Sequence, residues 1–501
     1  MQRFLCAAAV LYSACAAEPV ASTQQDVRLG VIEAHDQFGW AMATGDYNCD
    51  GVDDLAVSAI GEGPNGGKTT GSVFMYLGVT GLGLVPWTRI DEKDLLPLSL
   101  GNNDRFGSAL ASAKIDADAC SDLVIGAPGA AITSGGNHSG VVFVLYGSTT
   151  GLRIDNSVQV IDQHGLVSGE TDSPGDNFGA TLALSGENPP LLAIGVPGET
   201  VGSIKSGFVN VAKADLSQPK GQQFAKFAQL QPPTLDAGAQ FGTALVFSDF
   251  DFDGHRDLAV GEPDWGYSPG KVFVYPGNGS GYDAAVTVNE HSSLQTSNYD
   301  GFGSTLAVGA ILSNGGELIV GAPDFYTGNG RVFLYAPNGG HLSGFTVMDG
   351  IAVGNGGIGS SLKVADIDGD GNQDIVTGVP GHRSAQTGVD LGEIAIYEFH
   401  FDPEDLTLTQ QLSWTAQVGP SGYEVTPADG DDFGVPVAVG DFNADGKKDL
   451  VGGMPNRSDE GNGTDYIANS GAFVEFFGNG APTLSPPFTA ANGIYFDESS
   501  Q

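Results

Sequence analysis

Short runs of apolar residues recur along the chain, and each run is bounded by glycine, proline or aspartate. The second run of each unit reads, in chain order, DLAVSA, DLVIGAP, LLAIGVP, DLAVGEP, ELIVGAP, DIVTGVP and DLVGGMP. A third run opens with glycine and reads GSVFMY, GVVFVLY, GFVNV, GKVFVY, GRVFLY, GEIAIY and GAFVEFF. Runs of this length, rich in β-branched and aromatic residues between turn signals, predict strands. Six of the seven second runs end in Gly-x-Pro, where proline cannot continue a hydrogen-bonded ladder.

The first run of each unit follows a Phe-Gly step. The steps begin at Phe38, Phe106, Phe178, Phe241, Phe302 and Phe433, with a weaker copy at Ile358-Gly359. Each unit also has a vaguer fourth run, such as 158–161. Four short antiparallel strands repeated radially are typical of propeller blades. The sequence therefore predicts an all-β fold, a seven-bladed β-propeller of four-stranded antiparallel blades that start near 38, 106, 178, 241, 302, 358 and 433.

A linear solenoid is the competing architecture, but its terminal units should be atypical because they cap the stack. Here the seventh unit is as regular as the fourth, which favours a closed ring spanning 18–501 as one domain. Either the segment 27–32 or the tail 493–496 is expected to complete the last blade.

Four units carry the pattern D-x-[DN]-x-D-G-x-x-D between the first and second strands. Alternate positions turn their oxygens inward, and the glycine at the sixth position permits a sharp turn. Side-chain capping alone can also form an acidic turn, but four copies at matching positions favour metal binding. Oxygen ligands without a histidine or cysteine side chain favour Ca²⁺ over Mg²⁺ or Mn²⁺. About four calcium sites are predicted, with the seventh residue of each contributing its backbone carbonyl: Asp46, Asn48, Asp50, Val52 and Asp54; Asp249, Asp251, Asp253, His255 and Asp257; Asp366, Asp368, Asp370, Asn372 and Asp374; Asp441, Asn443, Asp445, Lys447 and Asp449.

The second unit has a degenerate loop in which Lys114 replaces the first aspartate. Its ammonium is expected near the position where a cation would sit. The third and fifth units have no cage. Cys49 and Cys120 fall in the first and second loops, on adjacent blades, and either a disulfide or two free thiols fits the sequence.

The chain has 60 acidic and 20 basic residues and a formal charge of −40, which excludes nucleic acid as a partner. Residues 1–17 are predicted to be a signal peptide, with a lipid anchor at Cys15 as the alternative. No later apolar run reaches the ~18 residues that a membrane-spanning helix needs. A secreted or cell-surface location is expected. The sequons at Asn137, Asn278, Asn456 and Asn462 are glycan acceptors in a eukaryotic source or chance matches.

Taken together, Phe-Gly, the acidic loop and Gly-x-Pro resemble the FG-GAP repeat of the integrin α-subunit propeller, over roughly residues 27–480. The resemblance implies seven blades with calcium sites on one face and ligand-binding loops on the other. No inserted metal-binding domain, leg domain or membrane span is found, so an integrin chain itself is not expected. Microbial stand-alone relatives and the propeller of glycosylphosphatidylinositol-specific phospholipase D are closer in organisation.

On this resemblance, the loops opposite the calcium face are expected to bind an extracellular protein or glycan. Candidate ligand-binding residues are Trp265, Tyr267, Tyr326 and Arg383, beside Phe325, His382 and Tyr466; the alternative for each is packing within its own loop. No catalytic constellation is recognised, so the chain is predicted not to be an enzyme but a binding or adhesion module. The alternatives are a calcium-dependent polysaccharide-active enzyme and a structural scaffold of a surface complex.

Overall fold

The computed structural model describes most of the chain between residues 34 and 496. Its gaps are 64–68, 96–100, 102, 117, 133–137, 168–172, 264–269, 290–299, 312–315, 339–340, 349–355, 383–391, 403–406, 417–429, 459–469 and 479–493. The expected signal peptide, Cys15 and the segment 27–32 therefore lie outside the described residues.

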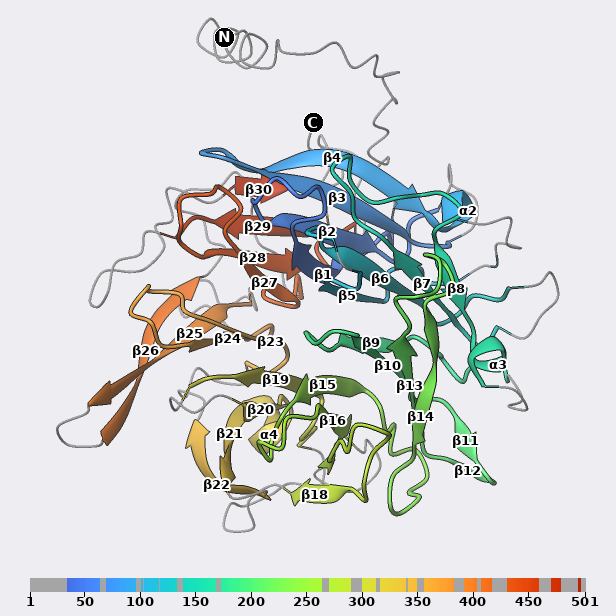
Figure 1. Ribbon diagram of the computed structural model, residues 1–501. Coiled ribbons are helices and arrows are strands. Elements are labelled where there is room, and N and C mark those ends of the chain that lie inside the picture. The colour runs from blue at the N-terminus through green and yellow to red at the C-terminus, as the bar shows by residue number, and fades with distance from the viewer. Residues whose placement is uncertain are drawn as a thin grey trace, which may run out of the picture.

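Seven four-stranded antiparallel sheets form the molecule (Figure 1), which confirms the predicted all-β, seven-bladed propeller. Blades 1 to 3 contain β1 (Phe38–Gly45), β2 (Asp54–Ala59), β3 (Ser72–Val79) and β4 (Gly83–Asp91); β5 (Ala109–Ala113), β6 (Asp122–Ala127), β7 (Val141–Leu145) and β8 (Gln159–Ile161); β9 (Thr181–Leu184), β10 (Leu191–Val196), β13 (Phe208–Ala214) and β14 (Phe224–Leu230). Blades 4 and 5 contain β15 (Ala244–Ser248), β16 (Asp257–Glu262), β17 (Lys271–Tyr275) and β18 (Val286–Asn289); β19 (Thr305–Gly309), β20 (Glu317–Ala322), β21 (Arg331–Asn338) and β22 (His341–Met348). Blades 6 and 7 contain β23 (Leu362–Ala365), β24 (Asp374–Gly378), β25 (Ile394–Asp402) and β26 (Thr407–Ala416); β27 (Val437–Gly440), β28 (Asp449–Met454), β29 (Ala472–Phe476) and β30 (Ile494–Phe496).

Little else is regular in the described part of the chain. A two-stranded hairpin, β11 (Thr200–Val201) and β12 (Ile204–Lys205), is inserted in blade 3. The helices are single turns, α2 (Glu92–Leu95), α3 (Gln163–Leu166) and α4 (Phe325–Gly328). No helix among the described residues has both the length and the apolar character needed to cross a bilayer.

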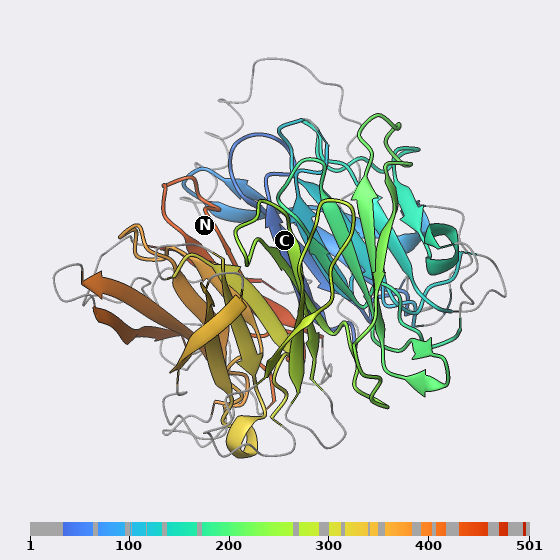
Figure 2. The same cartoon turned by 60° about the horizontal axis from the view of Figure 1, so that its bottom comes forward.

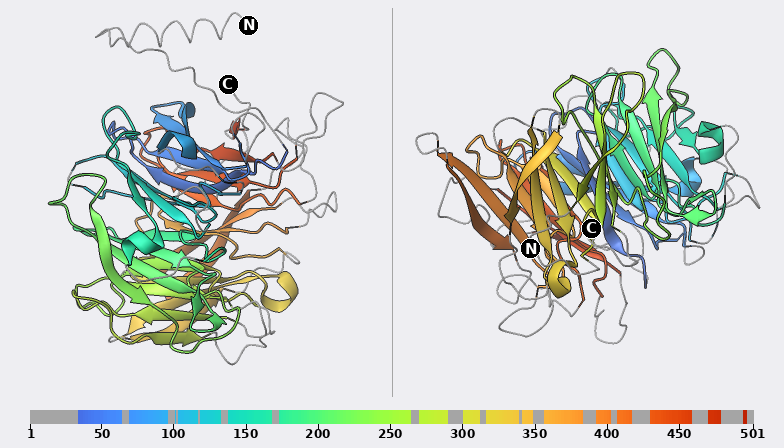
Figure 3. Two further views of the ribbon diagram at one scale, coloured as in Figure 1. Left: turned by 90° about the vertical axis from the view of Figure 1, so that its right-hand side faces the viewer. Right: turned by 90° about the horizontal axis from the view of Figure 1, so that it is seen from below.

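Within each blade, the first strand lies nearest the middle of the ring and the fourth lies at the rim (Figure 1). The sheets pack face to face around the ring, as Figures 2 and 3 show from other sides. Consequently the middle strands are covered on both faces, and β2, β6 and β10 are buried at every residue. This explains why the second strands read as continuous apolar runs rather than as an alternation.

Seven hydrophobic clusters fill the seven interfaces between neighbouring blades. The phenylalanine of each Phe-Gly step packs against the preceding blade. Phe106 of blade 2 joins the cluster built from blade 1, and Phe38 of blade 1 joins the cluster built from blade 7. The repeated phenylalanine is thus the residue that holds one blade to the next.

A backbone contact accompanies each of these phenylalanines. The glycine that opens each third strand lies directly against the Phe-Gly step of the following blade, as Gly207 does against Phe241. A Cβ atom on Gly207 would lie 2.2 Å from the Phe241 carbonyl oxygen, and its φ of +92° disfavours other residues. This close approach is the physical reason for the glycine at the start of the third strand.

The same contact closes the ring. Gly471 of blade 7 pairs with Phe38 of blade 1, and the Phe38 N–H donates to the Ser470 carbonyl at 3.0 Å. The closed architecture is therefore confirmed over the solenoid. The C-terminal strand β30 pairs with β29, so the tail completes blade 7.

Candidate metal centres

Four acidic turns join the first and second strands of blades 1, 4, 6 and 7. They span residues 46–53, 249–256, 366–373 and 441–448, directly before β2, β16, β24 and β28. Because the blades share one strand order, these turns lie on one face of the propeller.

The fourth-blade turn shows how the chain shapes each loop. Asp249 accepts hydrogen bonds from the Asp253 N–H at 3.1 Å on Oδ1 and from the Gly254 N–H at 3.0 Å on Oδ2. Asp251 and Asp253 each accept on Oδ1 from the backbone two residues ahead, at 3.1 and 2.8 Å. These short-range bonds fold the turn; Asp249 and Asp251 are partly buried in it, whereas Asp253 is exposed.

The other three turns repeat this arrangement. The first aspartate accepts from the sixth-position glycine N–H at 3.0 Å for Asp46, 3.0 Å for Asp366 and 2.9 Å for Asp441. The fifth aspartate accepts from the seventh N–H at 2.7 to 3.0 Å in the same turns. Four turns therefore have one shared geometry.

The ninth aspartate has a second role, which the sequence pattern did not reveal. Asp257 accepts from the Phe250 N–H at 2.7 Å on Oδ2 and from the Gly277 N–H at 2.8 Å on Oδ1. It thereby clamps the turn to the chain that leaves the third strand. Asp54 and Asp449 bind Gly78 and Gly478 in the same way, at 3.0 and 2.9 Å.

Burial perturbs these ninth aspartates. It raises the pKa of Asp54 to about 7, of Asp257 to about 6 and of Asp374 to about 8. Backbone N–H donors oppose the rise in pKa, whereas neighbouring carboxylates of the same turn add to it. The charged form of each turn therefore lacks compensation from the protein alone, which is the electrostatic setting of a cation site.

The oxygens converge as a metal site requires. Ligand oxygens of Asp249, Asp251 and Asp257 lie within 4.8 Å of one another. Ligand oxygens of Asp366, Asp368 and Asp374 do the same. In the first and seventh turns the third position is an asparagine, whose side-chain oxygen is also a hard ligand.

One atom makes the fit to a cation explicit. Asp368 is 1% exposed, and its Oδ2 has no hydrogen-bond partner among the described residues. A buried carboxylate oxygen without a partner is energetically unfavourable unless a cation or proton compensates it. The donor set around it consists of oxygens, which suits Ca²⁺.

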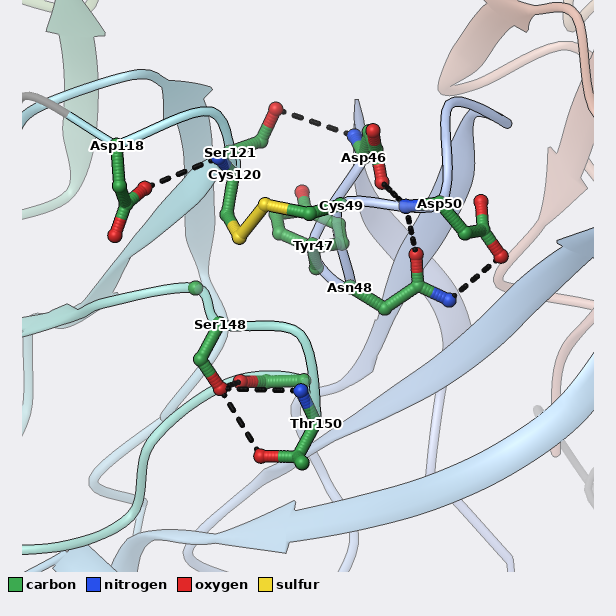
Figure 4. The surroundings of a disulfide bond; sticks show 12 residues. Asp46, Tyr47, Asn48, Cys49, Asp50, Asp118, Cys120, Ser121, Ser148 and Thr150 are labelled. Carbon is green, nitrogen blue, oxygen red and sulfur yellow. Dashed lines mark hydrogen bonds between the residues drawn. A yellow bond between two sulfur atoms is a disulfide. The ribbon is translucent and has the colours of Figure 1, made fainter. Parts of the chain in front are cut away.

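A disulfide joins the first acidic turn to the turn of the next blade. Cys49 and Cys120 are bonded, with their Cα atoms 4.7 Å apart (Figure 4). Beside the disulfide, the Asp46 N–H donates to Ser121 Oγ at 3.1 Å, and the Ser121 N–H donates to the Asp46 carbonyl at 2.7 Å. The two turns are thus linked covalently and by hydrogen bonds.

In the second turn, the contacting ammonium is not the one expected. Lys114 is exposed, whereas Lys220 of blade 3 forms ion pairs with Asp116 and Asp118. The expectation for Lys114 is therefore corrected. Lys220 lies 102 residues after Asp118, so no local pattern indicates it.

The candidate ligand-binding residues are only partly described. Phe325 is buried in the hydrophobic cluster between blades 4 and 5, so it packs internally. His382 is buried, with Nδ1 at 2.9 Å from Glu393 Oε2. Tyr326 lies in α4, but its side chain, together with Trp265, Tyr267, Arg383 and Tyr466, lies outside the described residues.

A cavity of about 220 Å³ lies beside the acidic turn of blade 4, residues 249–256. Lys213, His255 and Arg256 line it together with Phe227 and Glu187. Three basic side chains thus gather in a strongly acidic chain. The sequence did not indicate this cavity, because its walls come from two different blades.

Comparison with known proteins agrees with the fold. The FG-GAP repeat family matches residues 38–74, 241–275 and 358–397. A phosphatidylinositol-glycan-specific phospholipase D of Dictyostelium discoideum is 28% identical over 331 residues, which are 61% of this chain and 34% of that protein. The Homo sapiens protein of the same name is 27% identical over 383 residues, 69% of this chain and 43% of the relative. Integrin alpha-PS5 of Drosophila melanogaster is 32% identical over 166 residues, 32% of this chain and 15% of the relative.

These matches confirm the FG-GAP repeats and homology to integrin alpha subunits. They contradict the prediction that the chain is not an enzyme, because five similar proteins carry the name of a phospholipase D. That prediction relied on motifs with fixed local spacing, and a site assembled from distant blades has no such signature. The chain spans less than half the length of these relatives.

Proposed function

We propose that this FG-GAP-repeat propeller, homologous to integrin alpha subunits, is a calcium-binding module of a secreted or surface-attached protein and engages an extracellular protein or glycan. The observation that carries the calcium assignment is Asp368 Oδ2, which is buried without a hydrogen-bond partner in the described part of the chain, within a turn that resembles those of three other blades. A bound Ca²⁺ would supply the positive charge that the converging carboxylates lack.

The residues that would hold the ions are the side chains at positions one, three, five and nine, with the seventh carbonyl. Fourteen carboxylates belong to these four turns, and four divalent ions would offset eight of their charges. The Oδ1 atoms of the third and fifth aspartates in the fourth turn already accept backbone hydrogen bonds. Their Oδ2 atoms would then be available to a cation, which supports the proposal.

Calcium at these turns would support recognition by making the blades rigid. Asp257 ties its turn to Gly277 after the third strand, so an ordered turn also orders the end of its blade. A ligand that meets a preorganised surface loses less conformational entropy on binding. Glycan-array and cell-binding screens of the purified protein, with and without chelator, test this role. No binding in any of these screens would contradict it.

The calcium assignment is tested by melting. Extracellular calcium modules bind with Kd of about 10⁻⁴ to 10⁻³ M, so 10 mM Ca²⁺ should stabilise each site by about 1.4 to 2.7 kcal/mol. Asp253→Asn keeps an oxygen for the His255 N–H but removes a charge from the cage. It should reduce the calcium-dependent rise in Tm by about a quarter. Asp283→Asn, an exposed change in the same blade, is the matched control and should leave the rise unchanged.

A second candidate function comes from the relatives named phosphatidylinositol-glycan-specific phospholipase D. On this proposal the chain acts on phosphatidylinositol-glycan anchors. Incubating the purified chain with a glycan-anchored reporter and measuring its transfer from detergent to water tests the activity directly. Calcium-dependent release supports it, and no release above a heat-inactivated control contradicts it.

A further inference from the structure

The turn of the second blade keeps the shape of the four acidic turns although its sequence is degenerate. Asp116 Oδ1 accepts from the Asp118 N–H at 2.9 Å, and Asp118 Oδ1 accepts from the Cys120 N–H at 3.0 Å. Asp122 clamps the turn by accepting from the Ile115 and Gly147 N–H groups at 2.7 and 2.8 Å. As in the turn of blade 4, the Oδ1 atoms at the third and fifth positions accept backbone hydrogen bonds. The Oδ2 atoms of Asp116 and Asp118 are left for another interaction.

Those two remaining oxygens meet an ammonium. Lys220 Nζ forms an ion pair with Asp116 Oδ2 and lies 3.4 Å from Asp118 Oδ2. Lys220 stands on the turn between β13 and β14 of blade 3, so it reaches across the interface between two blades. The ring of Tyr146 lies beneath the ammonium, with the ring centroid 4.9 Å from Nζ. Two carboxylates and an aromatic face thus hold one cationic group.

Comparison with the acidic turn of blade 6 identifies the position that the Lys220 ammonium occupies. Asp116 and Asp368 occupy the same third position of the repeat. The Oδ2 atoms of both residues are buried without a hydrogen-bond partner among the described residues, but that of Asp116 forms an ion pair with Lys220. The lysine therefore contacts the oxygen that a metal would contact in the other turns.

We propose that the second turn is a latent divalent-cation site in which the Lys220 ammonium substitutes for the metal. The proposal rests on calcium binding at the four acidic turns. It explains why this turn keeps its fold although Lys114 stands in place of the first aspartate. The single positive charge of Lys220 replaces the two positive charges of a bound divalent ion. It also makes the contact between blades 2 and 3 independent of calcium.

The test is to convert the latent site into a metal site. Lys114→Asp restores the first ligand, and Lys220→Met removes the competing ammonium. Calcium per chain is counted by native mass spectrometry after chelation and titration. The double variant should bind one ion more than the wild type. Lys114→Asp alone should bind that ion at least tenfold more weakly, because Lys220 competes. Lys226→Met, an exposed change in blade 3, is the control and should match the wild type.

The outcomes separate this proposal from the function on which it rests. A folded double variant that binds no additional ion overturns the latent site, and so does equal affinity in Lys114→Asp alone. Wild-type protein that binds no calcium overturns the proposed function instead, and an ion taken up only by the double variant would still support the latent site.

If the variants do not fold, a measurement on the unmodified chain still tests the proposal. Reductive methylation with mass mapping should label Lys220 several-fold more slowly than Lys226, with or without chelator, because the ammonium is held by two carboxylates. Equal labelling rates would overturn the proposal.

Discussion

Asp53 and Asp441 hydrogen-bond to each other across the seam where the ring closes. The Asp441 N–H donates to Asp53 Oδ2 at 2.9 Å, and the Asp53 N–H donates to the Asp441 carbonyl at 3.3 Å. Asp441 is also the first residue of the acidic turn in blade 7, and Asp53 lies within the acidic turn of blade 1. Two candidate metal centres therefore meet at the junction of the first and last blades.

Replacing Asp53 should weaken this seam. Asp53→Ala removes this hydrogen bond and an ion pair with Lys448, so the free energy of unfolding in urea should fall by about 1 to 2 kcal/mol. Hydrogen exchange of the Asp441 amide should accelerate, since that amide loses its acceptor. Asp283→Ala is the control, because the described side-chain hydrogen bond of Asp283 is to Asn278 in its own turn. Equal exchange of the Asp441 amide in both variants would contradict the described seam.

Gly207 should not tolerate a side chain. Gly207→Ala would place a methyl group 2.2 Å from the Phe241 carbonyl oxygen, so blades 3 and 4 would have to separate. We expect a loss of at least 2 to 3 kcal/mol, roughly the upper range for backbone strain with overpacking. Gly238→Ala has a similar φ of +82° but nothing within 4 Å, and should lose only about 1 kcal/mol. Equal losses would show that strain at positive φ, not the approach of the blades, determines the effect.

Glu92 should make stability depend on pH. Burial, and secondarily Asp104, raises its pKa from 4.5 to about 8. The folded state therefore holds a proton that the unfolded state releases, and stability should fall as the pH rises from about 4.5 to about 8. Glu92→Gln should be more stable than the wild type at pH 8, by roughly 2 to 4 kcal/mol, and equal to it near pH 4.

The control for Glu92 is Asp94→Asn, which changes an exposed carboxylate on the same helical turn. It should leave the pH profile of urea unfolding unchanged. A Glu92→Gln profile parallel to the wild type between pH 5 and 8 would mean that Glu92 ionises normally in the folded protein.

The Cys49–Cys120 disulfide should stabilise the first two blades. The disulfide joins residues that are 71 apart in the sequence. Removing it should lower the free energy of unfolding by about 2 to 4 kcal/mol. Denaturation of a Cys49→Ser, Cys120→Ser variant measures this loss. Adding reductant should lower the free energy of unfolding of the wild type toward that of the variant and should not change that of the variant. An equal change in both proteins would show that the reductant does not act through this disulfide.

The sequence predicted the features that repeat, because repetition converts weak local signals into one pattern. The seven blades, the closed ring and the shape of the acidic turns follow from Phe-Gly steps and from oxygens at alternate positions. Contacts between blades could not be predicted in this way. Lys220 meets a turn 102 residues away, and Asp53 meets Asp441 at the other end of the ring.

The prediction that the chain is not an enzyme is contradicted by the names of five relatives, not by a feature of the fold. The cavity lined by Lys213 and Arg256 also has no counterpart in a local motif, because its walls come from the neighbouring blades 3 and 4. The hydrogen bond between Asp257 and Gly277 could not be predicted from the sequence, because the donor is a backbone N–H that no residue type reveals.

Counting calcium tests the central claim most directly. Chelator-treated protein is dialysed to equilibrium against buffered Ca²⁺ at about 10 mM, roughly tenfold or more above the Kd typical of extracellular modules, and the bound metal is measured by atomic emission. The proposed cages predict about four ions per chain, and about three after Asp253→Asn. Calcium no higher in the protein compartment than in the buffer, or the same count in the variant as in the wild type, would contradict the account.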